Sequence, residues 1–230
     1  MNATPGAAAP VFRPVGESAL MVEFGTGIDL ETHAHVLALD AALQAQPFDG
    51  FTEAVPAYAS LMVCFDPLVT DHLRARRAMA GLLKQPGQPA PDPAPREVTV
   101  CYDGEFGTDL AEVAAATGLS TEAVINAHLG GDYRVFMYGF APGYAYLAGV
   151  PEPLHLPRKP AAIRGVPAGS VIMAGAQCLV TTITMPTGWW RLGRSPTAIL
   201  TGDEAHPFLF DIGDKVRFRR IGLDEFHGGR

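Results

Sequence analysis

The 230-residue sequence lacks the patterns that several classes of protein require. Its three cysteines, Cys64, Cys101 and Cys178, lie far apart and form no CxxC pair, so we predict neither a metal site nor a disulfide framework. The longest apolar runs fall well short of the ~18 residues of a membrane-spanning helix, and the N-terminal residues show no secretory leader pattern. We therefore expect a cytoplasmic protein with no membrane partner.

Basic residues and nucleotide-binding motifs are also scarce. The chain has 17 basic and 24 acidic residues, a net charge of −7, which argues against a nucleic-acid partner. No GxGxxG motif opens a helix and no GxxxxGK[ST] motif occurs, so no cofactor or ATP site is expected in this chain. No GxSxG motif occurs, so the sequence does not predict the nucleophile elbow that is typical of serine hydrolases.

What the sequence does contain is ordinary globular composition, with 48% hydrophobic and 18% charged residues, and one conspicuous proline-rich segment. Residues 85–95 read QPGQPAPDPAP, which forbids helix and favours an extended spacer. This predicts a domain at 1–84, a linker at 85–95 and a second domain at 96–230. An exposed loop inside a single domain is the alternative.

Short apolar segments and helical spacing predict the order ββαββα in the first domain. The expected strands are 12–15, 19–24, 51–55 and 60–65. One expected helix begins after a cap at Asp29 and ends at Gln46, and the other covers 71–84, with Leu73 and Met79 facing inward. The class is α+β, with helices on an antiparallel sheet.

The second domain reads as mostly β. A strand at 97–102 precedes a helix at 109–116, whose Asp109 and Glu112 have capping-box spacing, and a short helix after Ser120. Strand-like segments then recur between glycines and prolines, which suggests a closed or nearly closed barrel. They are 133–138, 170–174, 179–184, 188–192, 198–200 and 215–220.

Acidic residues almost vanish between Tyr133 and Gly202. This segment has six basic residues and one acidic residue, a net charge of +5, so the rest of the chain carries −12. Five of the six bases are arginines, whose planar fork suits carboxylates. The segment also contains GFAPGYAYLAG at 139–149, a rigid loop that fits either a pocket wall or a packed barrel corner.

Several motifs in series carry a family resemblance. They are GFAPGYAYLAG, PRKPAAIRGVPAGSV, GAQ and MPTGWWRLGRSP, joined by AVPAYASLMVCFDP and CYDGEFGTDL nearer the N-terminus. In this order and spacing the sequence resembles allophanate hydrolase subunit 1, also called carboxyltransferase subdomain C and D. That family includes the B subunit of bacterial 5-oxoprolinase and a sporulation-kinase inhibitor.

The resemblance implies a fold and an assembly. The fold is an α+β domain followed by a cyclophilin-like β-barrel. The assembly pairs this chain with a second carboxyltransferase-type subunit, like allophanate hydrolase subunit 2 or the C subunit of 5-oxoprolinase. In the 5-oxoprolinase branch a third component completes the ATP-driven opening of 5-oxoproline to glutamate, with ATP used at a partner subunit.

The cationic segment and the motif series together predict a pocket for a small carboxylate substrate. Its expected residues are Phe140, Gly143, Tyr144, Arg158, Arg164, Gln177 and Arg194. No nucleophile is evident, so acid or base catalysis would fall to His128, to His155 or to a partner residue.

Two departures from the family pattern bear on the substrate. A Thr-Gly-Ile-Tyr-Pro run is replaced by residues 178–182, and Ile163 precedes Arg164 where a proline is usual. The leading hypothesis is a hydrolase subunit of 5-oxoprolinase that is inactive alone. Allophanate hydrolysis in urea breakdown and non-catalytic inhibition of a histidine kinase are the alternatives.

Overall fold

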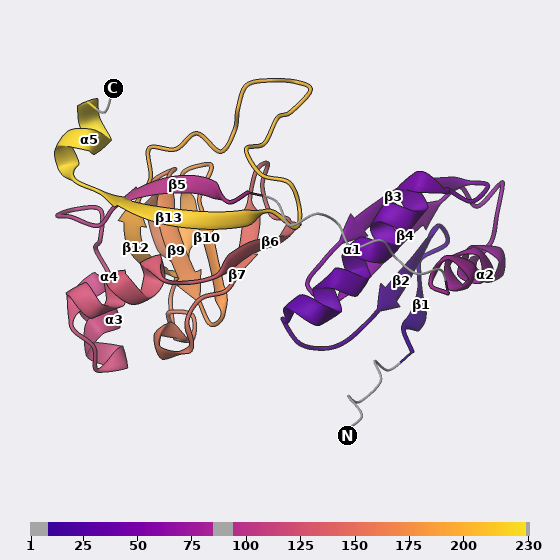
Figure 1. The fold of residues 1–230 in the computed structure, drawn as a ribbon, viewed down its shortest axis with the longest axis horizontal. Helices are drawn as coiled ribbons and strands as arrows, with labels where there is room; N and C mark the ends of the chain where they lie inside the picture. Colours follow the sequence, from indigo (N-terminus) through magenta and orange to yellow (C-terminus); the bar gives the residue numbers. More distant parts are fainter. Residues whose placement is uncertain (1–8, 85–93, 229–230) are drawn as a thin grey trace. The chain divides into compact units, whose positions relative to one another are not determined.

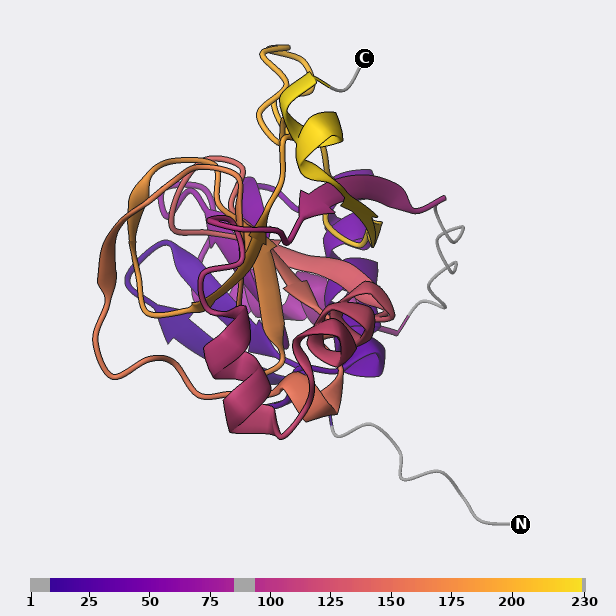
Figure 2. The ribbon, with the colours of Figure 1, turned by 90° about the vertical axis from the view of Figure 1, so that its left-hand side faces the viewer.

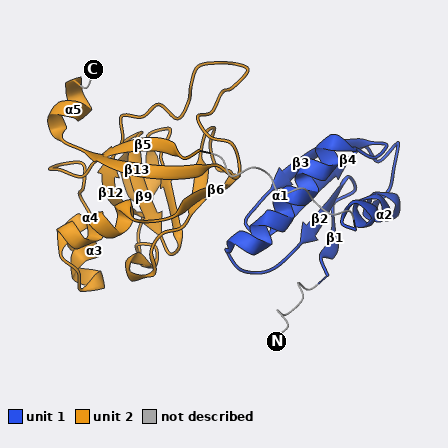
Figure 3. Ribbon diagram, in the orientation of Figure 1, with its two compact units in different colours: residues 1–92 blue, residues 93–230 orange. Residues whose placement is uncertain are grey.

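The computed structural model describes residues 9–84 and 94–228. They fall into two compact units, Met1–Asp92 and Pro93–Arg230 (Figure 3). Nearly all of the expected linker at 85–95 lies outside the described residues. No described helix is long and apolar enough to cross a membrane.

Unit 1 is an antiparallel sheet with two helices in the expected ββαββα order (Figure 1). The sheet order is β1-β2-β4-β3. The elements are β1 (Val11–Val15), β2 (Ala19–Glu23), α1 (Leu30–Ala45), β3 (Phe51–Pro56), β4 (Ser60–Phe65) and α2 (His72–Leu82).

Side-chain caps and strand alternation explain these elements. Asp29 Oδ1 accepts the Thr32 N–H at 2.8 Å and starts α1, and Asp71 starts α2 in the same way. Alternate residues of β4 point into the unit's core, where they meet the apolar sides of both helices. The prediction for Leu73 was wrong, because this residue in the first turn of α2 is 56% exposed.

Unit 2 contains a closed barrel of seven strands in the order β10-β7-β6-β13-β5-β12-β9. This confirms the predicted mostly β domain after an α+β domain. Its elements are β5 (Arg96–Cys101), α3 (Leu110–Thr117), α4 (Thr121–Leu129), β6 (Tyr133–Tyr138), β7 (Ala145–Ala148), η1 (Glu152–Leu154), β8 (Ile163–Val166), β9 (Ser170–Ala174), β10 (Gln177–Val180), β11 (Met185–Thr187), β12 (Trp190–Arg194), β13 (Lys215–Ile221) and α5 (Leu223–Gly228).

Strand β13 closes the barrel. It pairs with β5 in parallel and with β6 antiparallel, and α5 continues from it to lie beside β5 (Figure 2). Apolar side chains from the barrel strands and from α3 and α4 form one core. Strands β8 and β11 pair outside the barrel in a small separate sheet.

Four details of unit 2 differ from the sequence predictions. The segment 198–200 forms only a bridge between Leu200 and Phe208, and β7, β8 and β11 were not predicted. Strand β10 ends at Val180, short of the expected residue 184, although the Thr181 N–H still donates to Ser170 O and Thr181 O accepts from the Gly169 N–H. Asp109 precedes α3 but makes no side-chain cap.

Candidate functional site

Three of the predicted site residues line one pocket on the outside of the barrel. This aromatic pocket has a volume of about 170 Å³. Its lining residues are Phe140, Tyr144, Tyr146, Arg158, Ile172, Leu179, Met185, Pro186, Thr187, Gly188 and Trp189. Phe140, Tyr144 and Arg158 were predicted, whereas Trp189 and Met185 were not, although both lie in the MPTGWW motif.

Aromatic rings make the walls of the aromatic pocket. Tyr144, Tyr146 and Trp189 follow one another with ring centroids 6.0–6.2 Å apart. The Tyr144 hydroxyl donates to Met185 Sδ at 2.6 Å, and burial raises the pKa of Tyr144 well above its usual value. Tyr144 therefore stays protonated at neutral pH and can serve as a wall and a donor but not as a base.

Arg158 supplies the positive charge of the aromatic pocket. Its guanidinium lies over the Trp189 ring, 5.6 Å from the centroid. The neighbouring backbone is tied down on both sides, since Trp190 Nε1 donates to Pro157 O and Lys159 N donates to Gly188 O, each at 2.7 Å. The segment that carries Arg158 is therefore fixed against β12.

A buried ion pair strengthens this anchoring. Lys159 Nζ lies 2.7 Å from Asp109 Oδ2, and both side chains are less than 10% exposed. The same carboxylate oxygen accepts the Arg191 backbone N–H at 2.7 Å, and the Lys159 ammonium also faces the Trp190 ring. Lys159 thus neutralises Asp109 and is not available to a ligand.

Phe140 has an unusual backbone at the mouth of the aromatic pocket. Its φ is +69°, and no other non-glycine residue in the described part of the chain has a positive φ. The side chain is 74% exposed and touches the Tyr144 ring. A bulky residue held in the left-handed region and left exposed is typical of a functional position.

The other predicted binding residues lie elsewhere, so the seven do not form a single pocket. Arg194 lines a different pocket, Arg164 is exposed on β8, and Gln177 is half-buried on β10. Gly143 has φ +71°, and a Cβ there would crowd Leu200 and Thr182. The order of the motifs along the sequence could not show that these residues lie apart. The barrel places motifs that are neighbours in sequence on different faces.

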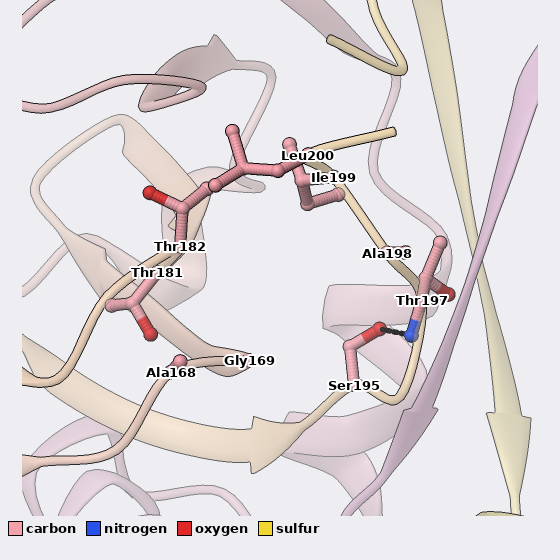
Figure 4. Close-up of a pocket in the computed structure, with 9 residues that line it drawn as sticks. All are labelled: Ala168, Gly169, Thr181, Thr182, Ser195, Thr197, Ala198, Ile199 and Leu200. Atoms are coloured by element: carbon pink, nitrogen blue, oxygen red, sulfur yellow. Dashed lines mark hydrogen bonds between the residues drawn. The ribbon is translucent and has the colours of Figure 1, made fainter. Parts of the chain in front are cut away.

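A third pocket of about 260 Å³, here called the hydroxyl pocket, carries no charge. Its lining residues are Ala168, Gly169, Thr181, Thr182, Ser195, Thr197, Ala198, Ile199 and Leu200 (Figure 4). Each of its four hydroxyl groups already takes part in a hydrogen bond within the chain. We therefore do not assign chemistry to the hydroxyl pocket.

His128, a predicted candidate acid or base, lies inside the barrel core. It is fully buried, with Nδ1 in hydrogen-bond contact with the Tyr102 hydroxyl at 2.8 Å and Nε2 3.6 Å from Cys178 Sγ. Burial lowers the pKa of His128 to about 3. A neutral side chain without solvent access has a structural role.

His155 is more accessible but is already engaged. Its Nε2–H donates to Val150 O at 2.7 Å, which holds the ring against the turn after β7. Within the described ranges, no three His, Cys, Asp or Glu side chains gather into a group that could hold a metal ion. The aromatic pocket itself presents one arginine and several aromatic side chains.

Comparison with known proteins places this arrangement in a family. Residues 10–210 match the family model described as carboxyltransferase domain, subdomain C and D. The chain belongs to this family. The predicted resemblance is confirmed.

Two bacterial relatives match almost end to end. The B subunit of 5-oxoprolinase from Bacillus subtilis (strain 168) is 38% identical over 224 residues, which cover 93% of either chain. The protein of the same name from Escherichia coli O157:H7 is 32% identical over 204 residues, 89% of this chain and 93% of that one.

Solved structures share the fold. TTHA0988 is 40% identical with a TM-score of 0.78, and the match covers 88% of this chain but only 40% of TTHA0988. PH0987 from Pyrococcus horikoshii is 34% identical with a TM-score of 0.55 over 94% of this chain and all of that one. The Kluyveromyces lactis urea amidolyase, 15% identical with a TM-score of 0.74 over 95% of this chain and 15% of its own, supports the fold alone.

Proposed function

We propose that this chain is the B-type subunit of an ATP-dependent 5-oxoprolinase, which opens the lactam of 5-oxoproline to give glutamate. The observation that carries the proposal is the 38% identity to the B subunit of a bacterial 5-oxoprolinase over 93% of both chains. A pocket in which an arginine faces aromatic walls agrees with a small, partly apolar carboxylate as the substrate.

In this proposal the aromatic pocket binds the substrate carboxylate. The terminal amino groups of the planar Arg158 guanidinium donate hydrogen bonds to this carboxylate. The Trp189 ring keeps the guanidinium in place. The rings of Tyr144 and Trp189 pack against the five-membered ring of 5-oxoproline, and Phe140 covers it from the solvent side. Anchoring of the Arg158 segment by Lys159 and Asp109 reduces the entropy lost on binding.

The catalytic groups and ATP would come from partner subunits. We propose a second carboxyltransferase-type subunit and a third 5-oxoprolinase component, with a cleft that closes over the aromatic pocket. Two observations support a partner there. The match to TTHA0988 takes up only 40% of that chain, and the apolar side chain of Phe140, which lines the aromatic pocket, is exposed.

A single substitution tests the role of Arg158. In a complex reconstituted with its partner subunits, Arg158→Gln should raise the KM for 5-oxoproline about tenfold or more, because a charged hydrogen bond to the carboxylate is lost. Arg217→Gln is the matched control, since Arg217 is exposed on β13. Glutamate release that depends on ATP is the assay. Equal KM values for wild type and Arg158→Gln would remove Arg158 from the site.

The two alternative functions keep their own tests. Release of ammonia from allophanate, compared with release of glutamate from 5-oxoproline, separates the hydrolase activities. Autophosphorylation of a histidine kinase with and without this chain tests inhibition. A complex that turns over allophanate and not 5-oxoproline would contradict the proposal.

A further inference from the structure

A second charged pocket lies apart from the aromatic pocket. This arginine pocket has a volume of about 260 Å³ and shares no lining residue with the aromatic pocket. Its lining residues are Glu105, Phe106, Thr108, Pro167, Ser170, Arg191 and Arg194. It holds two of the six basic residues of the cationic segment, and the function proposed above uses neither.

An irregularity in β12 brings the two arginines to one side. Residues three apart in a regular strand face opposite sides of the sheet, as Arg191 and Arg194 would. The pairing with β9 shifts between Arg191 and Gly193, so the strand contains one residue more than its partner. Leu192 turns into the barrel core, and both arginines line the same outer pocket.

Contacts within the chain hold each guanidinium while leaving its outer end open. Arg191 Nε donates to Thr108 Oγ1 at 2.7 Å, and Arg194 Nε donates to Ala168 O at 3.1 Å. The Arg194 guanidinium also lies 5.8 Å from the ring centroids of both Phe106 and Phe226. Across residues 9–84 and 94–228, the terminal amino groups of Arg191 and Arg194 have no hydrogen bond or ion pair.

Glu105 adds an acid to the same pocket. Although it shares the pocket with two arginines, it forms no ion pair with either of them in the described structure. The opposite charges therefore occupy different parts of the pocket, and the lining has two positive groups and one negative group. A ligand with two carboxylates and one ammonium group complements this arrangement.

We propose that the arginine pocket binds an acidic amino acid. The guanidinium groups of Arg191 and Arg194 donate hydrogen bonds to the two carboxylates of this ligand. The Glu105 carboxylate accepts a hydrogen bond from its ammonium group. The proposal stands on the pocket itself and does not require 5-oxoprolinase activity. If that activity holds, the reaction product glutamate belongs to the class of ligand that this pocket fits.

Calorimetric titration of the purified full-length chain with L-glutamate tests the proposal. We expect saturable binding in the millimolar range or tighter. Arg194→Gln and Arg191→Gln should each weaken it about tenfold or more, because each removes charged hydrogen bonds. Glutarate lacks the ammonium group and L-alanine lacks the second carboxylate, so both should bind at least about tenfold more weakly than L-glutamate.

Two variants make the outcome specific. Glu105→Gln alters an exposed side chain without an ion-pair partner among the described residues, and it should weaken L-glutamate about tenfold without weakening glutarate. Arg217→Gln should leave L-glutamate binding unchanged, since Arg217 is exposed on β13 and lines neither pocket. Absence of saturable binding, unchanged binding by Arg194→Gln, or loss caused by Arg217→Gln would each overturn the proposal. Equal binding of glutarate and L-glutamate would do the same.

Discussion

At the scale of single residues, Asp109 shows how one buried carboxylate joins distant segments. It lies at the start of α3, pairs with Lys159 and accepts the backbone N–H of Arg191. Burial of both charged side chains is costly unless each keeps its partner. The ion pair therefore holds the segment that carries Arg158 in place. The free-energy cost of burying the two charges is offset only while both partners are present.

Removing one partner of this pair should be more harmful than replacing both. We expect Lys159→Met to lower the free energy of unfolding by about 3–5 kcal/mol, because Asp109 is left charged and buried. The double variant with Asp109→Asn should recover most of this loss, since the amide oxygen still accepts from Arg191. Urea unfolding of the four proteins measures both values. Simple additivity of the two single effects would show that the ion pair is not coupled.

His128 predicts a pH dependence of stability. Its pKa is about 3 in the folded chain and about 6.5 when unfolded, so the unfolded chain takes up a proton first as the pH falls. The contribution of the neutral histidine is complete above about pH 6.5 and is lost between about pH 6.5 and pH 3. Between pH 7 and pH 5 this amounts to about 2 kcal/mol.

Replacing His128 with a side chain that does not titrate isolates this effect. His128→Gln should lower stability at pH 7, because the buried contacts with Tyr102 and Cys178 change. Its stability should fall by about 2 kcal/mol less than that of the wild type between pH 7 and pH 5. Urea unfolding at both pH values gives the comparison. Identical pH slopes would mean that other groups carry the dependence.

At the scale of elements, the close approach of β6 and β7 depends on a glycine. Gly149, directly after β7, has φ +110°, and a Cβ there would overlap the carbonyl of Asp132, just before β6. Gly104 also has a positive φ but has open space around it. The two positions therefore differ both in steric overlap and in φ, which is +110° at Gly149 and +55° at Gly104.

We expect Gly149→Ala to destabilise the chain more than Gly104→Ala. The Gly104 variant should cost about 1 kcal/mol from φ alone, whereas the Gly149 variant should cost at least about 2 kcal/mol more because the backbone must move. Thermal unfolding of both variants provides the comparison. Equal losses would indicate that the β6–β7 connection adapts without strain.

Most elements of both units could be predicted because their signals are local. The caps at Asp29 and Ser120 and the alternation in β4 depend on residues within one or two turns of each other. Strands β8 and β11 are short and pair outside the barrel, where alternation carries little information. The capping box at Asp109 failed because its side chain bonds residues that are distant in sequence.

The site could be predicted only in part for the same reason. Phe140 and Tyr144 lie in one loop, and Arg158 reaches them through the segment anchored on β12. Arg194 was grouped with them by charge, but the irregularity in β12 places it in the arginine pocket with Arg191. The amino-acid composition of a segment does not reveal a shift of one residue in the pairing of a strand.

At the scale of the whole molecule, the net charge of −7 hides a strongly positive segment. Within the segment of +5, Lys159 is neutralised by Asp109, Arg158 lies in the aromatic pocket, and Arg191 and Arg194 lie in the arginine pocket. Three of the six basic residues of this segment therefore lie in two separate pockets of unit 2. Small anions should meet a local potential opposite in sign to that of the molecule.

The salt dependence of anion binding tests whether the local positive charge or the overall negative charge of the chain controls the affinity. Between 0.01 M and 0.1 M salt the Debye length falls from about 30 Å to about 10 Å. If the local positive charge dominates, the affinity for L-glutamate should fall about twofold to fivefold over this range. Calorimetry at both salt concentrations gives the answer. A rise in affinity would mean that the overall negative charge controls binding.

The parallel pairing of β13 with β5 has a consequence for biosynthesis. Phe218 pairs with Val98, and β13 also separates β5 from β6, so the barrel closes only after residues up to the end of β13 have left the ribosome. Until then the edges of β5 and β6 present unpaired backbone groups. We expect nascent chains that lack β13 to be the most aggregation-prone species of unit 2.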